Sequence, residues 1–112
     1  MIVYNDFNTT VHKALDEIDP KWQSYNGLII CGTHTPVDPE FQIKAISEAR
    51  KSGVPFLGIC FGHQLAWIEE CRHSGIKDAT SEEWDKGTFV VKKRDKLKVG
   101  LHDGETYWNN YE

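Results

Sequence analysis

Residues 54–65 read Val-Pro-Phe-Leu-Gly-Ile-Cys-Phe-Gly-His-Gln-Leu, and this stretch passes from an apolar strand directly into a helix. The apolar run is typical of a parallel strand that is buried on both faces. Cys60 falls on the turn, with Gly58 and Gly62 two positions to either side. A nucleophile on so sharp a turn projects away from the backbone, and small neighbours let strand and helix approach closely. The free N–H groups at the start of the helix then face the sulfur.

A free cysteine is often no more than a small buried hydrophobic residue, and for Cys60 taken alone that is the ordinary interpretation. Its surroundings favour another one. An interior cysteine needs neither flanking glycines nor a polar Gln64 on the first turn of the helix that follows. We therefore interpret Cys60 as a nucleophile at a strand-to-helix elbow.

Helix and strand patterns alternate upstream of this elbow. Val11, Leu15 and Ile18 recur at helical spacing behind two capping candidates, Asn8 and Thr9, which predicts a first amphipathic helix. A first strand before that helix is expected to be missing or reduced to residues 1–4. Residues 27–31 form a short apolar run typical of a buried strand.

A second helix is predicted from the cap Asp38, with a first-turn proline behind it, to a stop at Gly53, and a third from the elbow to residues 74–75. Residues 88–91 and 97–99 resemble two short strands that pair as a hairpin. The alternation with short turns predicts an α/β fold with an open, mostly parallel sheet, flanking helices and right-handed crossovers.

The composition sets limits on size and partners. A chain of 112 residues with 39% hydrophobic residues predicts a single domain over residues 1–112 with a modest core. The net charge of −4 argues against nucleic-acid binding, which needs clustered Lys and Arg. No stretch suggests a membrane span or a signal peptide, so we expect a cytoplasmic protein without membrane contact. The three cysteines have neither a disulfide pattern nor metal-ligand spacing, and we expect no metal site.

The Gly-x-Cys-x-Gly-x-Gln pattern at residues 58–64 resembles the nucleophile elbow of the class I, triad-type glutamine amidotransferases. The resemblance implies an incomplete or minimal flavodoxin-like sheet and a Cys-His-Glu mechanism without a cofactor. The cysteine attacks the side-chain amide of L-glutamine, ammonia leaves, and water hydrolyses the thioester. On this basis Cys60 is the nucleophile, the N–H of Phe61 is one half of the oxyanion hole, and Gln64 helps to bind the substrate.

Residues 79–85, Ala-Thr-Ser-Glu-Glu-Trp-Asp, are similar to the Ala-Asn-Ser-Thr-Glu-Phe-Asp segment of the CTP synthase glutaminase domains. In that segment the glutamate contacts bound glutamine, which implies the same role for Glu83. The resemblance to this subfamily also implies a synthase domain or subunit that accepts the ammonia.

The sequence departs from the family pattern at three places. The oxyanion loop of the family reads Pro-Gly-Gly-Phe-Gly, whereas residues 31–35 read Cys-Gly-Thr-His-Thr, so Gly32 is the candidate for the second N–H donor. Residues 107–110, Tyr-Trp-Asn-Asn, stand where the family has His and Arg, which puts recognition of the substrate's α-carboxylate in doubt. The His-Pro-Glu segment, with the base and its orienting acid, is expected beyond Glu112.

We therefore expect a partial domain or a shrunken relative that alone has little or no activity. His34, in the loop facing Cys60, and His63, on the elbow helix, are the weak candidates for a substitute base, whereas His12, His73 and His102 read as surface or turn positions.

Three hypotheses follow. The first is a glutaminase module that supplies ammonia to a synthase partner. The second is a catalytically silent binding or regulatory module on the same scaffold. The third is a related cysteine hydrolase that acts on γ-glutamyl compounds.

Overall fold

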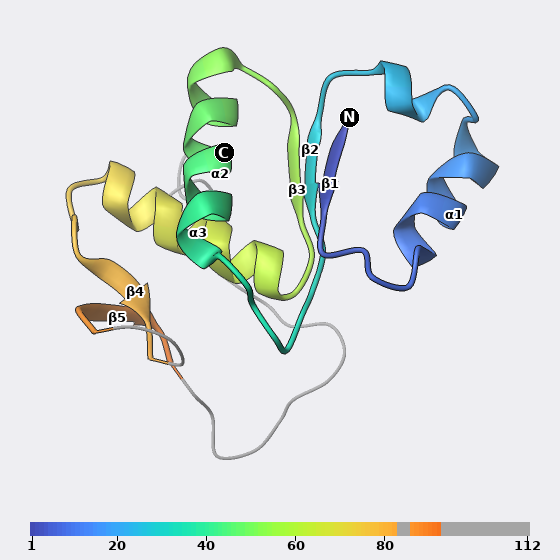
Figure 1. Ribbon diagram of the computed structural model, residues 1–112. Helices are drawn as coiled ribbons and strands as arrows, with labels where there is room; N and C mark the ends of the chain where they lie inside the picture. The colour runs from blue at the N-terminus through green and yellow to red at the C-terminus, as the bar shows by residue number, and fades with distance from the viewer. Residues whose placement is uncertain (83–85, 93–112) are drawn as a thin grey trace, which may run out of the picture.

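The computed structural model describes residues 1–82 and 86–92. A parallel three-stranded sheet lies at its centre, with strands β1 (Ile2–Tyr4), β2 (Leu28–Ile30) and β3 (Phe56–Gly58) in that order. Helices α2 (Pro39–Ser52) and α3 (Phe61–His73) cover one face, and α1 (Thr10–Ile18) lies on the other side of the strands (Figure 1). The predicted α/β fold with an open parallel sheet is therefore confirmed, and so is the first strand, reduced to three residues.

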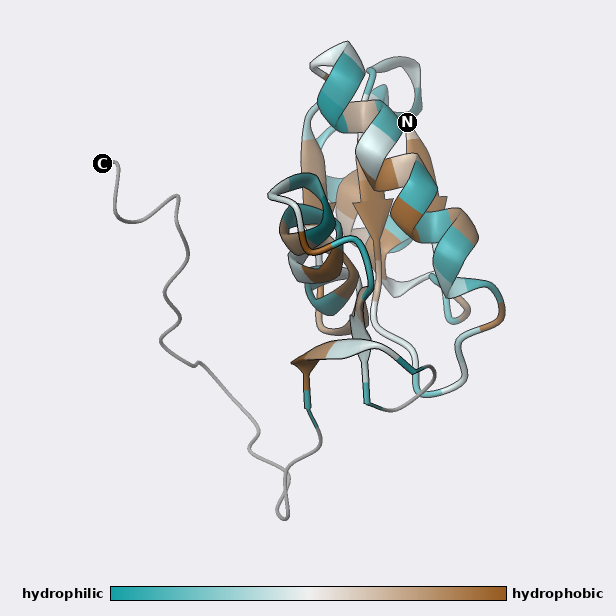
Figure 2. Ribbon diagram, turned by 90° about the vertical axis from the view of Figure 1, so that its left-hand side faces the viewer, coloured by the Kyte–Doolittle hydropathy of each residue, from teal (hydrophilic) through white to brown (hydrophobic). Residues whose placement is uncertain are grey.

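The core lies between the sheet and helices α2 and α3. Figure 2 shows the apolar colour on the strands of the central sheet. Leu28 and Ile30, at alternate positions of β2, point toward α2 and α3, where they join one buried cluster. Its helical members follow helical spacing and are Ile43, Ile46, Ala49, Phe61, Leu65, Ile68 and Cys71. Because the three strands are parallel, their carboxyl ends lie at one edge of the sheet.

Helix α2 begins and ends where the sequence predicts. The Asp38 side chain accepts a hydrogen bond from the backbone N–H of Phe41 at 3.1 Å, and Pro39 occupies the first turn. Gly53 ends the helix with a φ of 68°, a left-handed conformation that glycine adopts without a Cβ clash. Local sequence therefore suffices to define this helix.

The sequence predicts that both crossover connections between the strands are right-handed, and in the structure they are not. Both crossovers step in the same direction across the order β1-β2-β3, yet α1 and α2 lie on opposite faces (Figure 1), so only one of the two can be right-handed. The rule rests on a crossover helix packing back onto the sheet. Helix α1 has no buried residue, and its last residue, Ile18, is 79% exposed, so this packing restraint is weak here.

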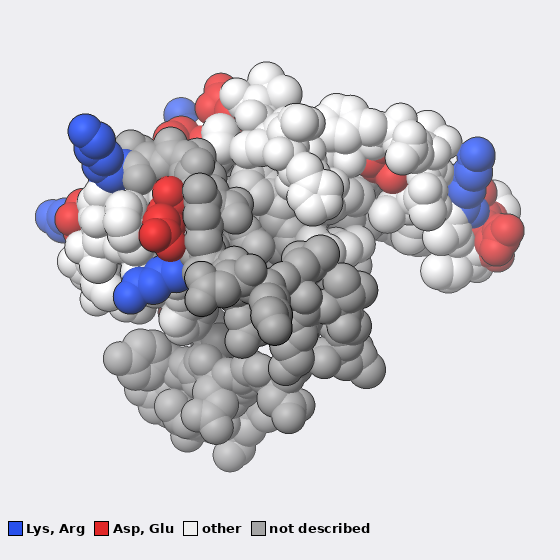
Figure 3. Space-filling view, turned by 90° about the horizontal axis from the view of Figure 1, so that it is seen from below, with Lys and Arg blue, Asp and Glu red and all other residues white. Residues whose placement is uncertain are grey.

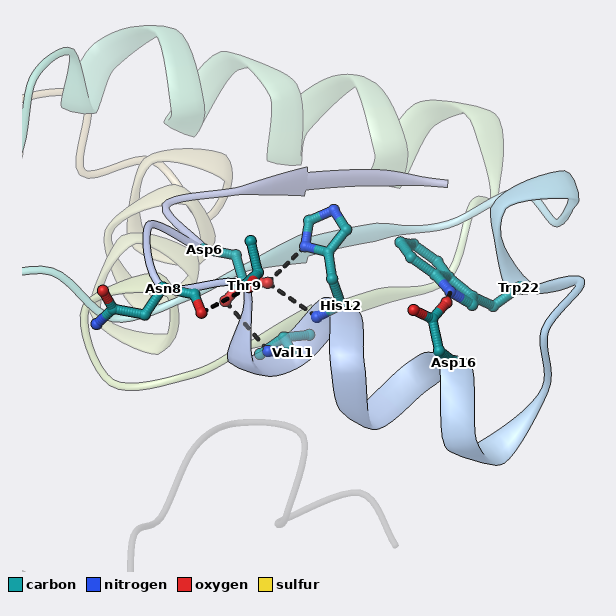
Figure 4. A network of polar contacts seen from close by, with 7 residues as sticks. All are labelled: Asp6, Asn8, Thr9, Val11, His12, Asp16 and Trp22. Atoms are coloured by element: carbon teal, nitrogen blue, oxygen red, sulfur yellow. Dashed lines mark hydrogen bonds and ion pairs between the residues drawn. The ribbon is translucent and has the colours of Figure 1, made fainter.

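The cap of α1 also differs from the prediction. Thr9 precedes the helix with a φ of 56° and makes no side-chain cap, and its hydroxyl donates instead to the backbone oxygen of Asn8. The cap is the carboxylate of Asp6, which accepts from the N–H of Val11 at 3.1 Å and from that of His12 at 2.9 Å (Figure 4). The cap therefore sits several residues earlier in the chain than the helical pattern suggests.

The Asp6 carboxylate also contacts the side chain of His12, on the first turn of α1. The ring Nδ1 of His12 lies 2.5 Å from Asp6 Oδ2, and the ring packs edge-on against Trp22, with centroids 5.1 Å apart. Trp22 is buried, and its indole N–H donates to Asp16 at 2.7 Å (Figure 4). This network ties α1 to the 3-10 helix Trp22–Ser24 that leads back to the sheet.

Acid should weaken this network. Burial by itself raises the pKa of Asp6, but the hydrogen bonds from the His12 ring and from the N–H groups of His12 and Val11 outweigh it and leave that pKa below its ordinary value. A depressed pKa in the folded state means that Asp6 stabilises the fold above the ordinary aspartate pKa of about 3.9, and that this contribution is lost as the pH falls through the folded pKa. We expect Asp6→Asn to lower stability at pH 7 and to flatten its decline below about pH 4 in urea titrations. An equally steep acid decline in the variant would contradict this assignment.

A second, two-stranded sheet follows α3. Strand β5 (Thr88–Val91) pairs in parallel with β4 (Ala79–Ser81), through contacts such as the Thr88 N–H to the carbonyl oxygen of Asp78 at 3.0 Å. The predicted strand at 88–91 is therefore present, and the partner that the structure gives it is β4. Residues 97–99, its predicted hairpin partner, lie outside the described residues. Within the described residues, no helix has the length and apolar character that crossing a membrane requires.

Candidate functional site at the strand-to-helix elbow

Cys60 stands between the end of β3 and the first residue of α3. Its backbone has φ 51° and ψ −109°, a conformation that residues with a Cβ rarely adopt and that costs about 1–3 kcal/mol. The residue is exposed to solvent. A strained, exposed cysteine at the start of a helix has the geometry of a nucleophile elbow, because the sharp turn lifts the side chain out of the sheet.

Two glycines make this turn possible. A Cβ on Gly58 would lie 2.7 Å from the carbonyl carbon and oxygen of Gly62, and one on Gly62 would lie 2.0 Å from the carbonyl oxygen of Ile30. Real Cβ atoms essentially never approach backbone atoms so closely. Glycine at position 58 therefore lets β3 approach the first turn of α3, and glycine at position 62 lets α3 approach β2.

Gly32 lies directly beside the nucleophile. A Cβ on Gly32 would stand 2.9 Å from the Cβ of Cys60 and 3.7 Å from its Sγ. The parallel ladder between β2 and β3 also stops here. The N–H of Ile59 donates to the carbonyl oxygen of Ile30 at 2.9 Å, but the carbonyl oxygen of Ile59 accepts from the N–H of Gly62 at 3.0 Å as the chain turns into the helix. The next N–H along the β2 side, that of Gly32, is thus left without its ladder acceptor.

Two backbone donors beside Cys60 have no acceptor in the part of the chain that the structure describes. Within residues 1–82 and 86–92, neither the N–H of Gly32 nor that of Phe61 donates a hydrogen bond. Phe61 is the first residue of α3, whose initial N–H groups have no acceptor inside the helix. If the Cys60 sulfur attacks a carbonyl carbon, the carbonyl oxygen becomes negatively charged. These two N–H groups could then donate hydrogen bonds to that oxygen.

Of the two predicted substrate-binding residues, the structure describes Gln64 and not Glu83. Gln64 is half-buried on the first turn of α3, and its N–H donates to the carbonyl oxygen of Cys60 at 3.0 Å. Glu83 lies outside the described residues, as do Trp84, His102 and residues 107–110. The structure therefore brings Gly32, Cys60, Phe61 and Gln64 together and leaves the role of Glu83 a prediction.

The remaining thiols differ from Cys60 in their surroundings. Cys31 and Cys71 are both buried. Burial raises the pKa of the Cys31 thiol, with a smaller contribution from the charge of Asp6, and burial together with Glu70 raises that of Cys71. Because the thiolate is the reactive form, these two cysteines should react slowly. Cys60 is the one cysteine that combines exposure with neighbouring unpaired donors.

No described histidine is hydrogen-bonded to Cys60 in the structure. His34, His63 and His73 are exposed, and His12 is engaged with Asp6 at the other side of the sheet. Among the described side chains, no hydrogen bond joins a histidine to Cys60. His63 instead lines a cavity of about 310 Å³ between α2 and α3, together with Arg50, Phe56 and Trp67, and Cys60 is not among the residues that line it. Of the described residues, no three His, Cys, Asp or Glu gather as a possible metal site.

Seen from below, acidic and basic side chains lie close to each other at both ends of the molecule's face (Figure 3). This view looks onto the carboxyl ends of the strands, the edge at which open α/β sheets bind their ligands. Charges of both signs are thus interspersed along the described borders of that edge.

Two polar arrangements are absent from the sequence predictions, one beside the Cys31–Gly32 peptide and one between α2 and α3. Asn5, Gln42 and the carbonyl oxygen of Cys31 form one hydrogen-bonded group, and Arg50 binds Glu69 and Glu70 between α2 and α3. The partners are 19 to 37 positions apart along the chain. Only the position of Asn5 immediately after an apolar strand gave any local signal.

The chain matches the family model "Glutamine amidotransferase class-I" over residues 2–110. It is 49% identical to a CTP synthase of Methanoregula boonei over 70 residues, which is 62% of this chain and 13% of that protein. It is 38% identical to a CTP synthase of Bdellovibrio bacteriovorus over 103 residues, which is 87% of this chain and 18% of that protein. A CTP synthase of Archaeoglobus fulgidus is 43% identical over 75 residues, 66% of this chain and 14% of that protein.

The chain spans less than a fifth of the length of these relatives. The family match nevertheless extends over nearly all of its residues and includes the complete elbow. On these grounds the chain belongs to the class I glutamine amidotransferase family.

Proposed function

We propose that this chain is a glutaminase module that forms a glutamyl thioester on Cys60 and supplies ammonia to a synthase domain or subunit of the CTP synthase type. One observation carries the proposal: beside an exposed cysteine on a strained turn lie two backbone N–H groups, those of Gly32 and Phe61, that have no acceptor among the described residues. Similarity to CTP synthases supports the choice of partner.

The proposed chemistry begins when the Cys60 thiolate attacks the side-chain amide carbon of glutamine. The carbonyl oxygen becomes negative and receives hydrogen bonds from the N–H groups of Phe61 and Gly32. The C–N bond then breaks, and nitrogen leaves as ammonia after taking up a proton. Water attacks the thioester, which releases glutamate and restores the thiol.

Proton transfer requires a base that accepts the thiol proton and an acid that protonates the leaving nitrogen. The family resemblance assigns both tasks to a histidine oriented by a glutamate, and no described residue of this chain takes that place. Gln64, on the first turn of α3, and Glu83 are proposed to contact the bound glutamine.

Covalent labelling tests the nucleophile. We expect diazo-oxonorleucine, an electrophilic glutamine analogue, to add once to the native chain and to be found on Cys60 by peptide mass spectrometry. Cys60→Ala should remove the label, whereas Cys71→Ser should keep it, because the pKa of the buried Cys71 is raised. Excess free glutamine should slow the labelling. A native chain that remains unlabelled would sink the proposal.

A second candidate function is a silent binding or regulatory module that retains the elbow. It is favoured by the absence of any hydrogen bond from a described histidine to Cys60. Release of glutamate from glutamine separates the two candidates. Turnover that disappears in Cys60→Ala supports the glutaminase, and glutamine binding without turnover supports the silent module.

A further inference from the structure

We propose that Asn5, held by Gln42, is a positioning residue that turns the N–H of Gly32 toward Cys60. This inference rests on the proposed thioester chemistry and adds to it a residue that directly follows β1, the strand farthest from the nucleophile in the sheet. It assigns a purpose to the polar group that the sequence predictions missed.

The contacts of Asn5 define its orientation. Its Nδ2 donates to the carbonyl oxygen of Cys31 at 3.2 Å and to Gln42 Oε1 at 2.9 Å, and Gln42 Nε2 donates to Asn5 Oδ1 at 3.1 Å. A backbone carbonyl oxygen can only accept, so the atom facing Cys31 must be the amide nitrogen. Gln42 is 6% exposed, so water does not compete with Asn5 for hydrogen bonds to its side-chain amide. The reciprocal amide pair therefore holds one donor against one particular peptide group.

That peptide group carries the N–H of Gly32. The carbonyl of Cys31 and the N–H of Gly32 belong to one planar trans peptide, in which they point in opposite directions. The preceding peptide of β2 points the other way round: the N–H of Cys31 donates to Tyr4 on the β1 side at 2.9 Å, and the carbonyl of Ile30 accepts from Ile59 on the β3 side. With the Cys31 carbonyl turned toward Asn5, the N–H of Gly32 is turned toward β3, where Cys60 stands.

The ladder itself does not supply this restraint. Beyond Ile30 the β2–β3 ladder has ended, because the carbonyl oxygen of Ile59 accepts from Gly62. The Cys31–Gly32 peptide is therefore free to rotate unless something holds its carbonyl side, and the described contact on that side is Asn5. Asn5 itself has a φ of 67°, which asparagine tolerates better than most residues with a side chain. This backbone turn places the side-chain amide of Asn5 beside Cys31 and Gln42.

The test compares two reactions of Cys60 in the intact chain. The first is acylation by the p-nitrophenyl ester of the glutamate γ-carboxylate, which passes through an oxyanion and whose leaving group needs no proton. The second is alkylation by iodoacetamide, which displaces iodide without forming an oxyanion. We expect Asn5→Asp to slow acylation roughly 10- to 100-fold, the range for a misoriented or weakened oxyanion donor, and to leave alkylation unchanged.

Two further variants separate orientation from charge and folding. Asn5→Gly adopts the left-handed backbone, adds no charge and removes the donor to Cys31, so it should slow acylation as Asn5→Asp does. Gln42→Met keeps that donor and loses only the supporting amide, so its acylation should fall much less. Acylation that is unaltered in both Asn5 variants would overturn the inference and leave the proposed function standing. An equal decline of both reactions would reduce Asn5 to a structural residue, and a wild-type chain that is never acylated would remove the proposed function as well.

Discussion

Replacing Gly62 with alanine is expected to lower the free energy of unfolding by about 3 kcal/mol, at the upper end of the usual cost of overpacking. The added Cβ would lie 2.0 Å from the carbonyl oxygen of Ile30, so α3 must move away from β2. Helix propensity acts in the opposite direction, because alanine inside a helix is favoured over glycine by about 1 kcal/mol. The clash should prevail, since it involves backbone atoms of the central strand and not the end of a flexible side chain.

Urea unfolding monitored by tryptophan fluorescence measures this loss. Gly53→Asn is the control, because Gly53 has nothing within 4 Å of an added Cβ, so a side chain there causes no clash, although its φ is 68°. Asparagine tolerates that conformation, so the control should change stability little. Labelling of Cys60 by diazo-oxonorleucine should also weaken in Gly62→Ala, because separation of strand and helix opens the elbow. A Gly62→Ala chain more stable than the parent would show that β2 and α3 are not in contact as described.

Arg50→Met is expected to destabilise the fold by about 3 kcal/mol or more at neutral pH, the cost of leaving a buried charge without its partner. Arg50 on α2 makes a two-pronged contact with Glu69 on α3, with Nε to Oε1 at 2.9 Å and Nη2 to Oε2 at 2.8 Å, and also binds Glu70. The carboxylate-bearing side chains are only 4% and 13% exposed. Hydrogen bonding to Glu69, opposed by burial and assisted by Glu70, raises the pKa of Arg50 further above its ordinary value.

Removing one charge of the Arg50–Glu69–Glu70 cluster should cost more stability than removing all three charges, and this difference supplies the control. The triple variant Arg50→Met, Glu69→Gln, Glu70→Gln removes all three charges and should recover much of the stability that Arg50→Met alone loses, because no buried charge remains unpaired. Glu40→Gln tests an exposed pair instead. Glu40 accepts from Arg72 at 2.7 Å and 2.8 Å but is 52% exposed, so its loss should cost less than about 1 kcal/mol. If Arg50→Met and Glu40→Gln cost the same, burial does not govern these ion pairs.

Much of the fold was predictable because its determinants are local. Apolar runs define β2 and β3, the Asp38 cap and Gly53 bound α2, and the glycines around Cys60 define the turn into α3. The predictions failed where the determinant is distant or unusual. The cap of α1 comes from Asp6, outside the helical pattern, and strand β4, which pairs with β5, reads Ala-Thr-Ser and has no apolar run that would predict a strand. Right-handed crossovers presuppose that each helix packs onto the sheet, and α1 has no buried residue.

By itself the sequence determined the elbow, because a cysteine between two spaced glycines at a strand-to-helix boundary restricts the backbone locally, whatever surrounds it. The family resemblance named Gly32 and Phe61 as donors, but only the tertiary structure shows why the Gly32 N–H has lost its ladder acceptor. Among the described residues the Gly32 N–H has no acceptor, because the Ile59 carbonyl has turned to Gly62, and we propose that its direction depends on an amide pair between Asn5 and Gln42, 37 positions apart. Contacts of that kind arise from the packing of β1, β2 and α2 at one edge of the sheet, and no local pattern encodes them.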